Sequence, residues 1–386
     1  MLESLLVYSL VFGVLFSCGK IAARGEKRYV GGSGYYQENT HFFSPEMVIL
    51  MVSFAMIFGC RWGVGRDYFR YLYAYTDIIP ERFEFLFQGI TVILKRIGAH
   101  FSIYFAIWAL LDIFLLYYSI RNYRFVFPYI AFFLIFGSYY LPMMNAVRQY
   151  ISALFFLYSI KYIEQKQFLK YCVCIVLAFL FHKLSIILFI IYPLLRLNDD
   201  WFKSPLLQFI LFFSAVILSF YSELIIQWIE IPFRWLTDVL GYNIYDYENL
   251  MDERYDRNRF GNNTGLGIWV KILITTPIIA LSKPFKEYYN SSHINMFYSL
   301  YFLGVLLSLL FGQSIVLNRI ALFFAIFQLI IHALFVYYCF DKKQLTHLLI
   351  GIMMILIQFP LFLNIVSNPS STAPFLFFWQ QFSTGV

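Results

Sequence analysis

The chain has 386 residues, of which 61% are hydrophobic and only 13% are charged. A soluble domain is usually nearer half apolar and a quarter charged, so this chain could not cover itself with polar surface in water. The composition excludes a soluble globular protein and predicts an integral membrane protein. The formal net charge of +7 fits the excess of cations that cytoplasmic turns carry, and we expect no nucleic-acid partner.

The cysteines and the N-terminus predict neither a metal site nor a cleaved leader. No histidine stands at ligand spacing from a cysteine, so we expect no zinc site and no disulfide framework. The start, Met1-Leu2-Glu3, lacks a basic region, and the run Leu5–Cys18 is interpreted as a retained first helix.

Apolar stretches suited to crossing a membrane recur along the whole chain. A span needs roughly 20 mostly apolar residues, and fewer where flanking side chains reach the interface. Residues 168–197 are either two short helices joined at His182-Lys183 or one long helix. Residues 85–96 are short and end in two charges, which favours an amphipathic helix on the membrane surface. The twelve predicted spans are 4–19, 45–60, 101–120, 125–141, 149–163, 168–181, 184–197, 205–222, 267–282, 294–312, 320–340 and 345–365.

The distribution of cations predicts which side the connections face. With the N-terminus outside, every cytoplasmic turn carries at least two cations, as the positive-inside rule requires. Merging 168–197 into one helix would put Lys342-Lys343 outside, which favours two helices. The sequence therefore predicts one transmembrane domain, 1–386, with outer loops at 61–96 and 223–266. Because the outer loops are long and varied, we expect function on that side.

The loop after the second span carries the first candidate site. Gly63 and Gly65 allow a ligand to approach the backbone closely. Arg61 and Arg66 offer planar donor forks that match phosphate oxygens. Asp67 could orient an arginine or accept a proton. The alternative is a solvated loop with a structural Arg–Asp pair.

Polar residues at the outer ends of later spans are further candidates. Arg148 lies at membrane level, where an unpaired charge costs at least ~2.5 kcal/mol, so it either functions or extends to the interface. Arg319 is placed in the same way. His182 could be a general base, a phosphate ligand or a satisfied structural histidine. Asp112 is an acid inside the third span, and the sequence does not identify its partner.

The long outer loop is rich in charge and tyrosine. It could bind a polar chain through charges and ring stacking, or it could simply be solvated. The residues concerned are Arg254, Tyr255, Arg257 and Arg259. The chain lacks a DxD motif, a Walker A motif, GxSxG and HExxH. Together these features predict a site for an anion, open to lipid, which allows a transferase, a transporter or a lipid-binding scaffold.

Motifs in these regions resemble a known family. The run Arg61-Trp-Gly-Val-Gly-Arg-Asp-Tyr-Phe69 is similar to the R-x-G-V-G-x-D-Y element of the EpsG/Wzy-type bacterial polysaccharide polymerases. Asn145-x-x-Arg148-Gln149, His182-x-x-Ser185 and Asn318-Arg319 follow in that family's order and spacing. The resemblance covers roughly 45–340, while 238–266 and 366–386 match no part of the family that we recognise.

The resemblance implies an all-α, GT-C-like polytopic membrane protein of the bacterial inner membrane, with its active site facing the periplasm. Such a protein joins repeat units linked to undecaprenyl pyrophosphate into O-antigen or a related surface polysaccharide. The lipid pyrophosphate leaves, so the transfer needs no metal and no cofactor, which agrees with the missing DxD motif. A single displacement inverts the anomeric carbon. A chain-length regulator protein is a further partner to look for.

The resemblance also implies roles for the candidate residues. We expect Arg66, Arg148 and Arg319 to stabilise charge on the departing pyrophosphate. Asp67 or His182 is the expected general base, and the sequence does not rank them. The expected substrate-binding residues are Arg61, Tyr68, Asn145, Gln149, Arg254, Tyr255, Arg257 and Arg259. Arg61 either assists the other arginines or holds the loop.

Other classes stay open at this point. An O-antigen ligase uses the same donor with a lipid A core acceptor. A flippase for lipid-linked oligosaccharides would need charges along several spans, whereas the charges here lie at the rims, apart from Asp112. A membrane acyltransferase would rest on one histidine.

Overall fold

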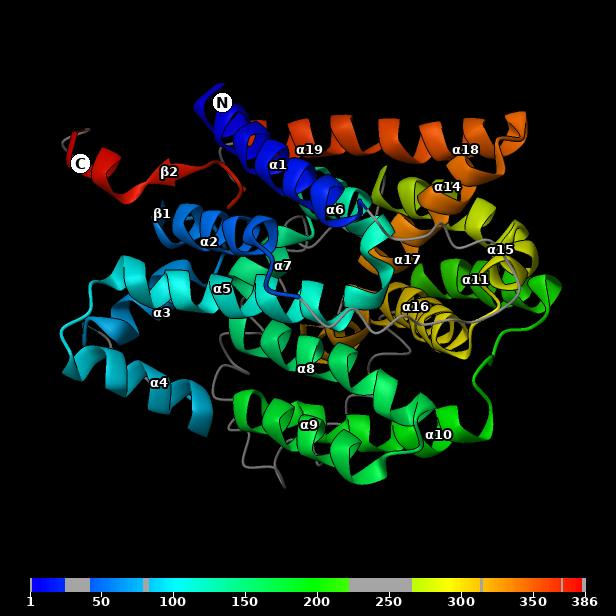
Figure 1. Cartoon of the computed structure of the whole chain (residues 1–386), viewed down its shortest axis with the longest axis horizontal. Coiled ribbons are helices and arrows are strands. Elements are labelled where there is room, and N and C mark those ends of the chain that lie inside the picture. The colour runs from blue at the N-terminus through cyan, green and yellow to red at the C-terminus, as the bar shows by residue number, and fades with distance from the viewer. Residues whose placement is uncertain are drawn as a thin grey trace.

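The computed structural model describes residues 2–24, 42–78, 83–221, 266–312, 315–368 and 371–383, and this part of the chain is almost entirely helical (Figure 1). It confirms the predicted all-α membrane protein. The described helices that are long and apolar enough to cross a membrane number five, or six if a bent pair counts as one span. The count of twelve stays a prediction. The five are Leu2–Ala22, Phe101–Ser119, Ser292–Phe311, Leu317–Lys342 and Leu345–Ser367.

The N-terminal half forms a bundle in which small residues let helices approach closely. Its helices are α1 (Leu2–Ala22), α2 (Pro45–Gly59), α5 (Phe101–Ser119), α6 (Phe127–Phe136) and α8 (Val147–Glu164). The chain passes from α5 to α6 through η1 (Arg121–Val126) and from α6 to α8 through α7 (Tyr140–Asn145). A Cβ added at Gly59 would lie 2.5 Å from Ala106 Cβ, so α2 and α5 touch at this position.

Residues 168–197 fold back on themselves at His182. The chain passes from α9 (Phe168–Phe181) into η2 (Lys183–Ile190) and α10 (Ile191–Leu197). His182 is extended, with φ −155° and ψ 112°. The Tyr171 hydroxyl donates to the Leu188 carbonyl, and the Tyr171 ring lies 5.1 Å from the Tyr192 ring. The two segments therefore run side by side, which is the hairpin that the charge distribution favours.

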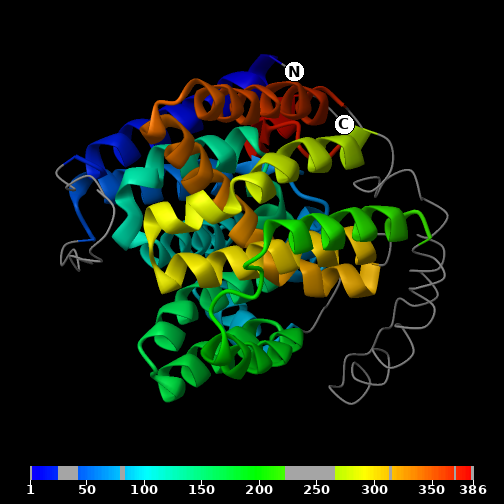
Figure 2. The ribbon, with the colours of Figure 1, turned by 90° about the vertical axis from the view of Figure 1, so that its right-hand side faces the viewer.

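The C-terminal half packs around one long, buried helix, α17 (Ile315–Lys342). Its neighbours are α16 (Ser292–Phe311), α18 (Leu345–Leu356) and α19 (Gln358–Ser367). Before them come α11 (Pro205–Ser219) and the pair α14 (Leu266–Ala280) and α15 (Ser282–Tyr289), which is bent by 59°. Figure 2 shows α18 and α19 along one side of the bundle and α9 and α10 along the opposite side.

Short elements gather at one end of the bundle, where Figure 1 shows α3 (Tyr68–Tyr75), α4 (Phe85–Arg96) and two short strands. In α4 the buried side chains are Phe87, Thr91 and Leu94, which fall on one helical face. Strand β1 (Arg61–Trp62) pairs antiparallel with β2 (Leu376–Phe377), and η3 (Phe378–Ser383) follows. Leu376 and Phe377 belong to the tail 366–386, in which no family motif was recognised from the sequence. This tail thus pairs with the loop that holds the first candidate site.

Candidate active site

Arg61 holds the loop after α2 in shape. It is only 1% exposed. Its Nε donates to the Val64 carbonyl at 3.1 Å and its Nη1 to the Phe58 carbonyl at 2.6 Å. The guanidinium lies 4.6 Å from the centre of the Phe105 ring. Arg61 therefore closes the loop by binding carbonyls of its own segment, and its side chain does not reach the surface.

The glycines bring the loop against α7. Gly63 and Gly65 have φ of +69° and +97°, a region that side chains other than glycine rarely enter. A Cβ at Gly65 would lie 2.6 Å from the Met144 carbonyl oxygen. The next contact is polar: the Asp67 N–H donates to Asn145 Oδ1 at 2.9 Å. Asn145, a predicted substrate-binding residue, thus positions the backbone of Asp67.

Arg148 begins α8 and points toward the same loop. It forms an ion pair with Glu84, and the two side chains are 17% and 7% exposed. Its guanidinium lies 4.8 Å from the centre of the Phe83 ring. Burial raises the pKa of the Tyr71 hydroxyl in α3, and the nearby charge of Arg148 opposes that rise. Arg148 is therefore fixed by the loop before α4 and lies close to Tyr71.

Arg319 and His182 complete the cluster from α17 and the α9–η2 turn. The Gln149 amide donates to the backbone carbonyl of Arg319, which joins the start of α8 to α17. His182 is 5% exposed and lies edge-on to Phe323, with ring centres 5.9 Å apart. Burial and the nearby charges of Arg148 and Arg319 lower the pKa of His182 well below its usual range. Its imidazole is therefore neutral at physiological pH.

Asp67 lies at the centre of the charges. Burial raises the pKa of its carboxyl, and four arginines oppose that shift through their positive charge. Asp67 and the Arg148 partner Glu84 set two carboxylates against four arginines, so the cluster keeps a net positive charge, which suits a polyanion such as pyrophosphate. The four are Arg66, Arg70, Arg148 and Arg319.

The structure thus brings Arg66, Asp67, Arg148, His182 and Arg319 to one end of the bundle. Tyr68 and Gln149 are buried beside them, with the Tyr68 ring stacked on Phe105 at 4.6 Å. The long-loop residues lie outside the part of the chain that the structure describes; they are Arg254, Tyr255, Arg257 and Arg259.

Three residues of the cluster were missed in the sequence. Arg70 and Tyr71 stand at the end of the motif-bearing loop and could have been found from that position. Glu84 gave no signal, because nothing local marks it as the partner of Arg148. Asp112 is buried in α5, close enough to Arg61 for the positive charge of Arg61 to act on its carboxyl group. Among the described residues, no group of three or more His, Cys, Asp or Glu could hold a metal ion.

The fold and the cluster define a class: an all-α membrane protein with an arginine-rich site at one end of its bundle. The chain belongs to the EpsG family, whose model matches residues 47–378. The match begins in α2 and extends through β2, so it includes every described residue of the cluster. No curated protein and no solved structure matches the chain. Membership confirms the resemblance seen in the motifs and gives the chain a polysaccharide polymerase-type function.

Proposed function

We propose that this protein joins oligosaccharide repeat units, linked to undecaprenyl pyrophosphate, into O-antigen or a related surface polysaccharide. The transfer takes place at the periplasmic face of the bacterial inner membrane. The observation that supports the proposal is a cluster built from three separate parts of the chain: the Asp67 N–H binds Asn145, Arg148 pairs with Glu84, Gln149 binds the Arg319 carbonyl, and four arginines act electrostatically on Asp67. Such a cluster is suited to a leaving group with several negative charges.

In the proposed reaction the growing glycan on its lipid pyrophosphate is the donor. A hydroxyl of the incoming unit attacks the anomeric carbon, the new C–O bond forms, and the bond to the pyrophosphate breaks. Arg66, Arg148 and Arg319 stabilise the charge that develops on the departing oxygen. They are preorganised for this, because Glu84 and Gln149 hold Arg148 and the Arg319 backbone in place. Attack from the opposite face inverts the anomeric carbon.

The proton of the attacking hydroxyl passes to Asp67 in this mechanism. Asp67 is half-buried on a loop, so an acceptor sugar can reach it, and burial raises the pKa of its carboxyl toward the range of an effective base. His182 is almost fully buried and packs against Phe323. We assign it to positioning, between Arg148 and Arg319, rather than to proton transfer.

The proposal is tested by the glycan ladder of a deletion strain. The strain is rescued with wild type, with Arg148→Ala, or with the control Arg121→Ala. Arg121 lies in η1, outside the cluster, and its guanidinium stacks on the ring of Tyr118 in α5. We expect the deletion to leave core plus one repeat, and wild type and Arg121→Ala to restore long chains. Arg148→Ala should stay at one repeat while its level in the membrane matches wild type.

Two results would contradict this proposal. If no repeat reaches the core in the deletion strain, the protein is a ligase or a flippase. If Arg148→Ala restores the full ladder, Arg148 has no part in the transfer.

A further inference from the structure

A polar cavity of about 370 Å³ lies at the other end of the bundle from the Asp67 cluster. It is formed where helices end: α8 finishes at Glu164, α10 at Leu197, and α16 starts at Ser292. Arg148 and Glu164 stand at opposite ends of α8, which at 1.5 Å per residue puts them roughly 24 Å apart along the helix. The cavity is therefore a separate site, near the opposite membrane face.

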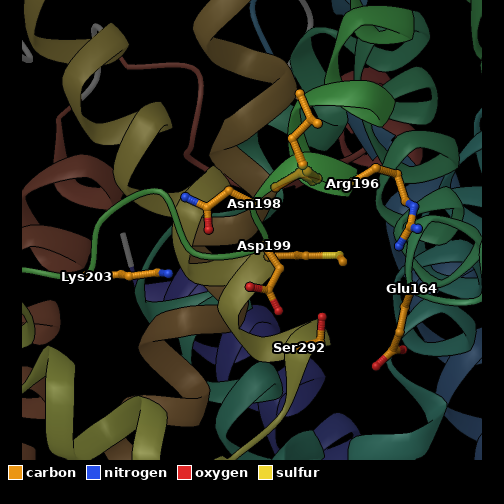
Figure 3. Close-up of a pocket in the computed structure, with 9 residues that line it drawn as sticks. Glu164, Arg196, Asn198, Asp199, Lys203 and Ser292 are labelled. Atoms are coloured by element: carbon orange, nitrogen blue, oxygen red, sulfur yellow. The ribbon is translucent and has the colours of Figure 1, made fainter.

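Four charged side chains line this cavity, two of each sign. In the view of Figure 3, Glu164 and Arg196 lie on one side, Lys203 on the other and Asp199 between them. Among the described residues, neither acid forms an ion pair with either base; the ion pairs seen there join other residues. Opposite charges that share a cavity without pairing leave both signs available to a ligand.

The wall of the cavity is fixed by buried contacts behind it. Lys286 forms an ion pair with Asp200 at 2.6 Å and donates to the Phe202 carbonyl at 2.9 Å. The Trp201 N–H donates to Ser299 Oγ at 3.1 Å. These bonds hold the segment between α10 and α11 on α15 and α16. Asp199 and Lys203, at either end of this segment, are thereby kept apart.

The rim of the cavity is apolar on the side of α10. Leu197 lines the cavity and is 85% exposed, and Leu194, one turn earlier, is 43% exposed. Ser292 begins α16, a helix long enough to cross a membrane. A cavity at the end of such a helix lies at the level of lipid headgroups, and the exposed leucines beside it can contact acyl chains.

We propose that this cavity binds the headgroup of a phospholipid that carries phosphoethanolamine. The phosphate is recognised by Arg196 and Lys203, as basic pockets beside transmembrane helices recognise headgroups. The ammonium donates hydrogen bonds to Glu164 and Asp199. The acyl chains extend over the leucine rim of α10.

This chemistry separates the candidate lipids. A phosphatidylcholine headgroup carries the same charges but has no N–H to donate to the acids. A phosphatidylglycerol headgroup keeps the phosphate and lacks the cation, so the two carboxylates would face no partner. Phosphoethanolamine can therefore bind both the two bases and the two acids of the cavity, whereas each of the other two headgroups lacks a charged hydrogen-bond donor for the acids.

The test is lipid binding to the purified full chain in detergent, measured by native mass spectrometry. The probes are phosphatidylethanolamine, phosphatidylcholine and phosphatidylglycerol at equal concentration, with soluble glycerophosphoethanolamine as competitor. We expect about tenfold tighter binding of phosphatidylethanolamine than of phosphatidylcholine, the worth of one hydrogen bond to a charged group. Weak competition by the soluble headgroup would show that the acyl chains contribute, and full competition at equal concentration would contradict the rim contact.

Variants test separately the acids and the bases that line the cavity. The double variant Glu164→Gln, Asp199→Asn should lose the preference for ethanolamine over choline, while Arg196→Gln should weaken both lipids. The matched control is Lys283→Gln with Glu287→Gln, which removes one charge of each sign from an exposed pair nearby on α15. Equal binding of the three lipids by wild type, or an unchanged preference in the double variant, would overturn the proposal. Each variant is accepted only if it elutes as wild type on size exclusion.

Discussion

Two adjacent segments that follow α2, Arg61–Gly65 and Arg66–Arg70, differ in the exposure of their charged side chains. In the first, Arg61 and Val64 are buried, and Arg61 binds carbonyls of its own segment. In the second, Arg66 and Arg70 are exposed and Asp67 is half-buried. Arginines five positions apart therefore differ in their surroundings: Arg61 is buried and maintains the loop, whereas Arg66 is exposed on the side where we propose that the substrate binds. Residue type alone does not separate the two.

The largest expected effect falls on the second segment. Asp67→Asn should lower the polymerisation rate by about 10²–10⁴, the usual contribution of a general base. The wild-type rate should fall as pH decreases through the raised pKa of Asp67, because the protonated carboxyl cannot accept a proton. The measurement is the rate of chain extension from lipid-linked units in membranes against pH.

The matched variant for that profile is His182→Gln. If the rate falls at a pH above the ordinary pKa range of aspartate, and falls in the same way in His182→Gln, the fall reports the protonation of Asp67. If the fall in rate at low pH disappears in His182→Gln, the histidine is the base and Asp67 is not.

The next effect sharpens the contrast between the two arginines. Arg61→Ala removes two charge-assisted hydrogen bonds and leaves the Phe58 and Val64 carbonyls without this donor, at a cost of about 3 kcal/mol of stability. Arg66→Ala, at an exposed position, should change stability by less than ~1 kcal/mol while it lowers polymerisation. Thermal unfolding in detergent measures the first effect and the glycan ladder the second. Equal melting temperatures in both variants would remove the distinction.

A smaller effect tests the glycine that separates the segments. Gly65→Ala combines strain at positive φ with a clash against the Met144 carbonyl, and should cost more than ~2 kcal/mol. Gly63→Ala meets only Phe69 ring atoms at 3.7 Å or more, so strain alone applies and the cost is about 1 kcal/mol. Thermal unfolding compares them; a larger loss for Gly63→Ala would argue against the close approach of the loop to α7.

The sequence predicted the helical membrane fold and the family correctly, because hydropathy and short motifs carry that information. The reversal at His182 followed from charge counting alone. The pairing of Arg61 with Phe377 could not be predicted, since strands of two residues show no alternation and their partners are distant in sequence. The role of Glu84 was hidden for a related reason: only the tertiary fold places it beside Arg148. The number of spans and the roles of the cluster residues stay predictions.

The tail that pairs with the loop has a consequence for how the protein is made. The Phe375 carbonyl accepts from Ser4 Oγ, a contact 371 positions apart in sequence, and the Thr372 carbonyl accepts from the Gly65 N–H. During synthesis the loop leaves the ribosome long before these partners exist. The arginine cluster therefore reaches its final arrangement only when residues 372–378 have been translated and placed. Chains released early would carry most of the helices but a site without the support of residues 372–378.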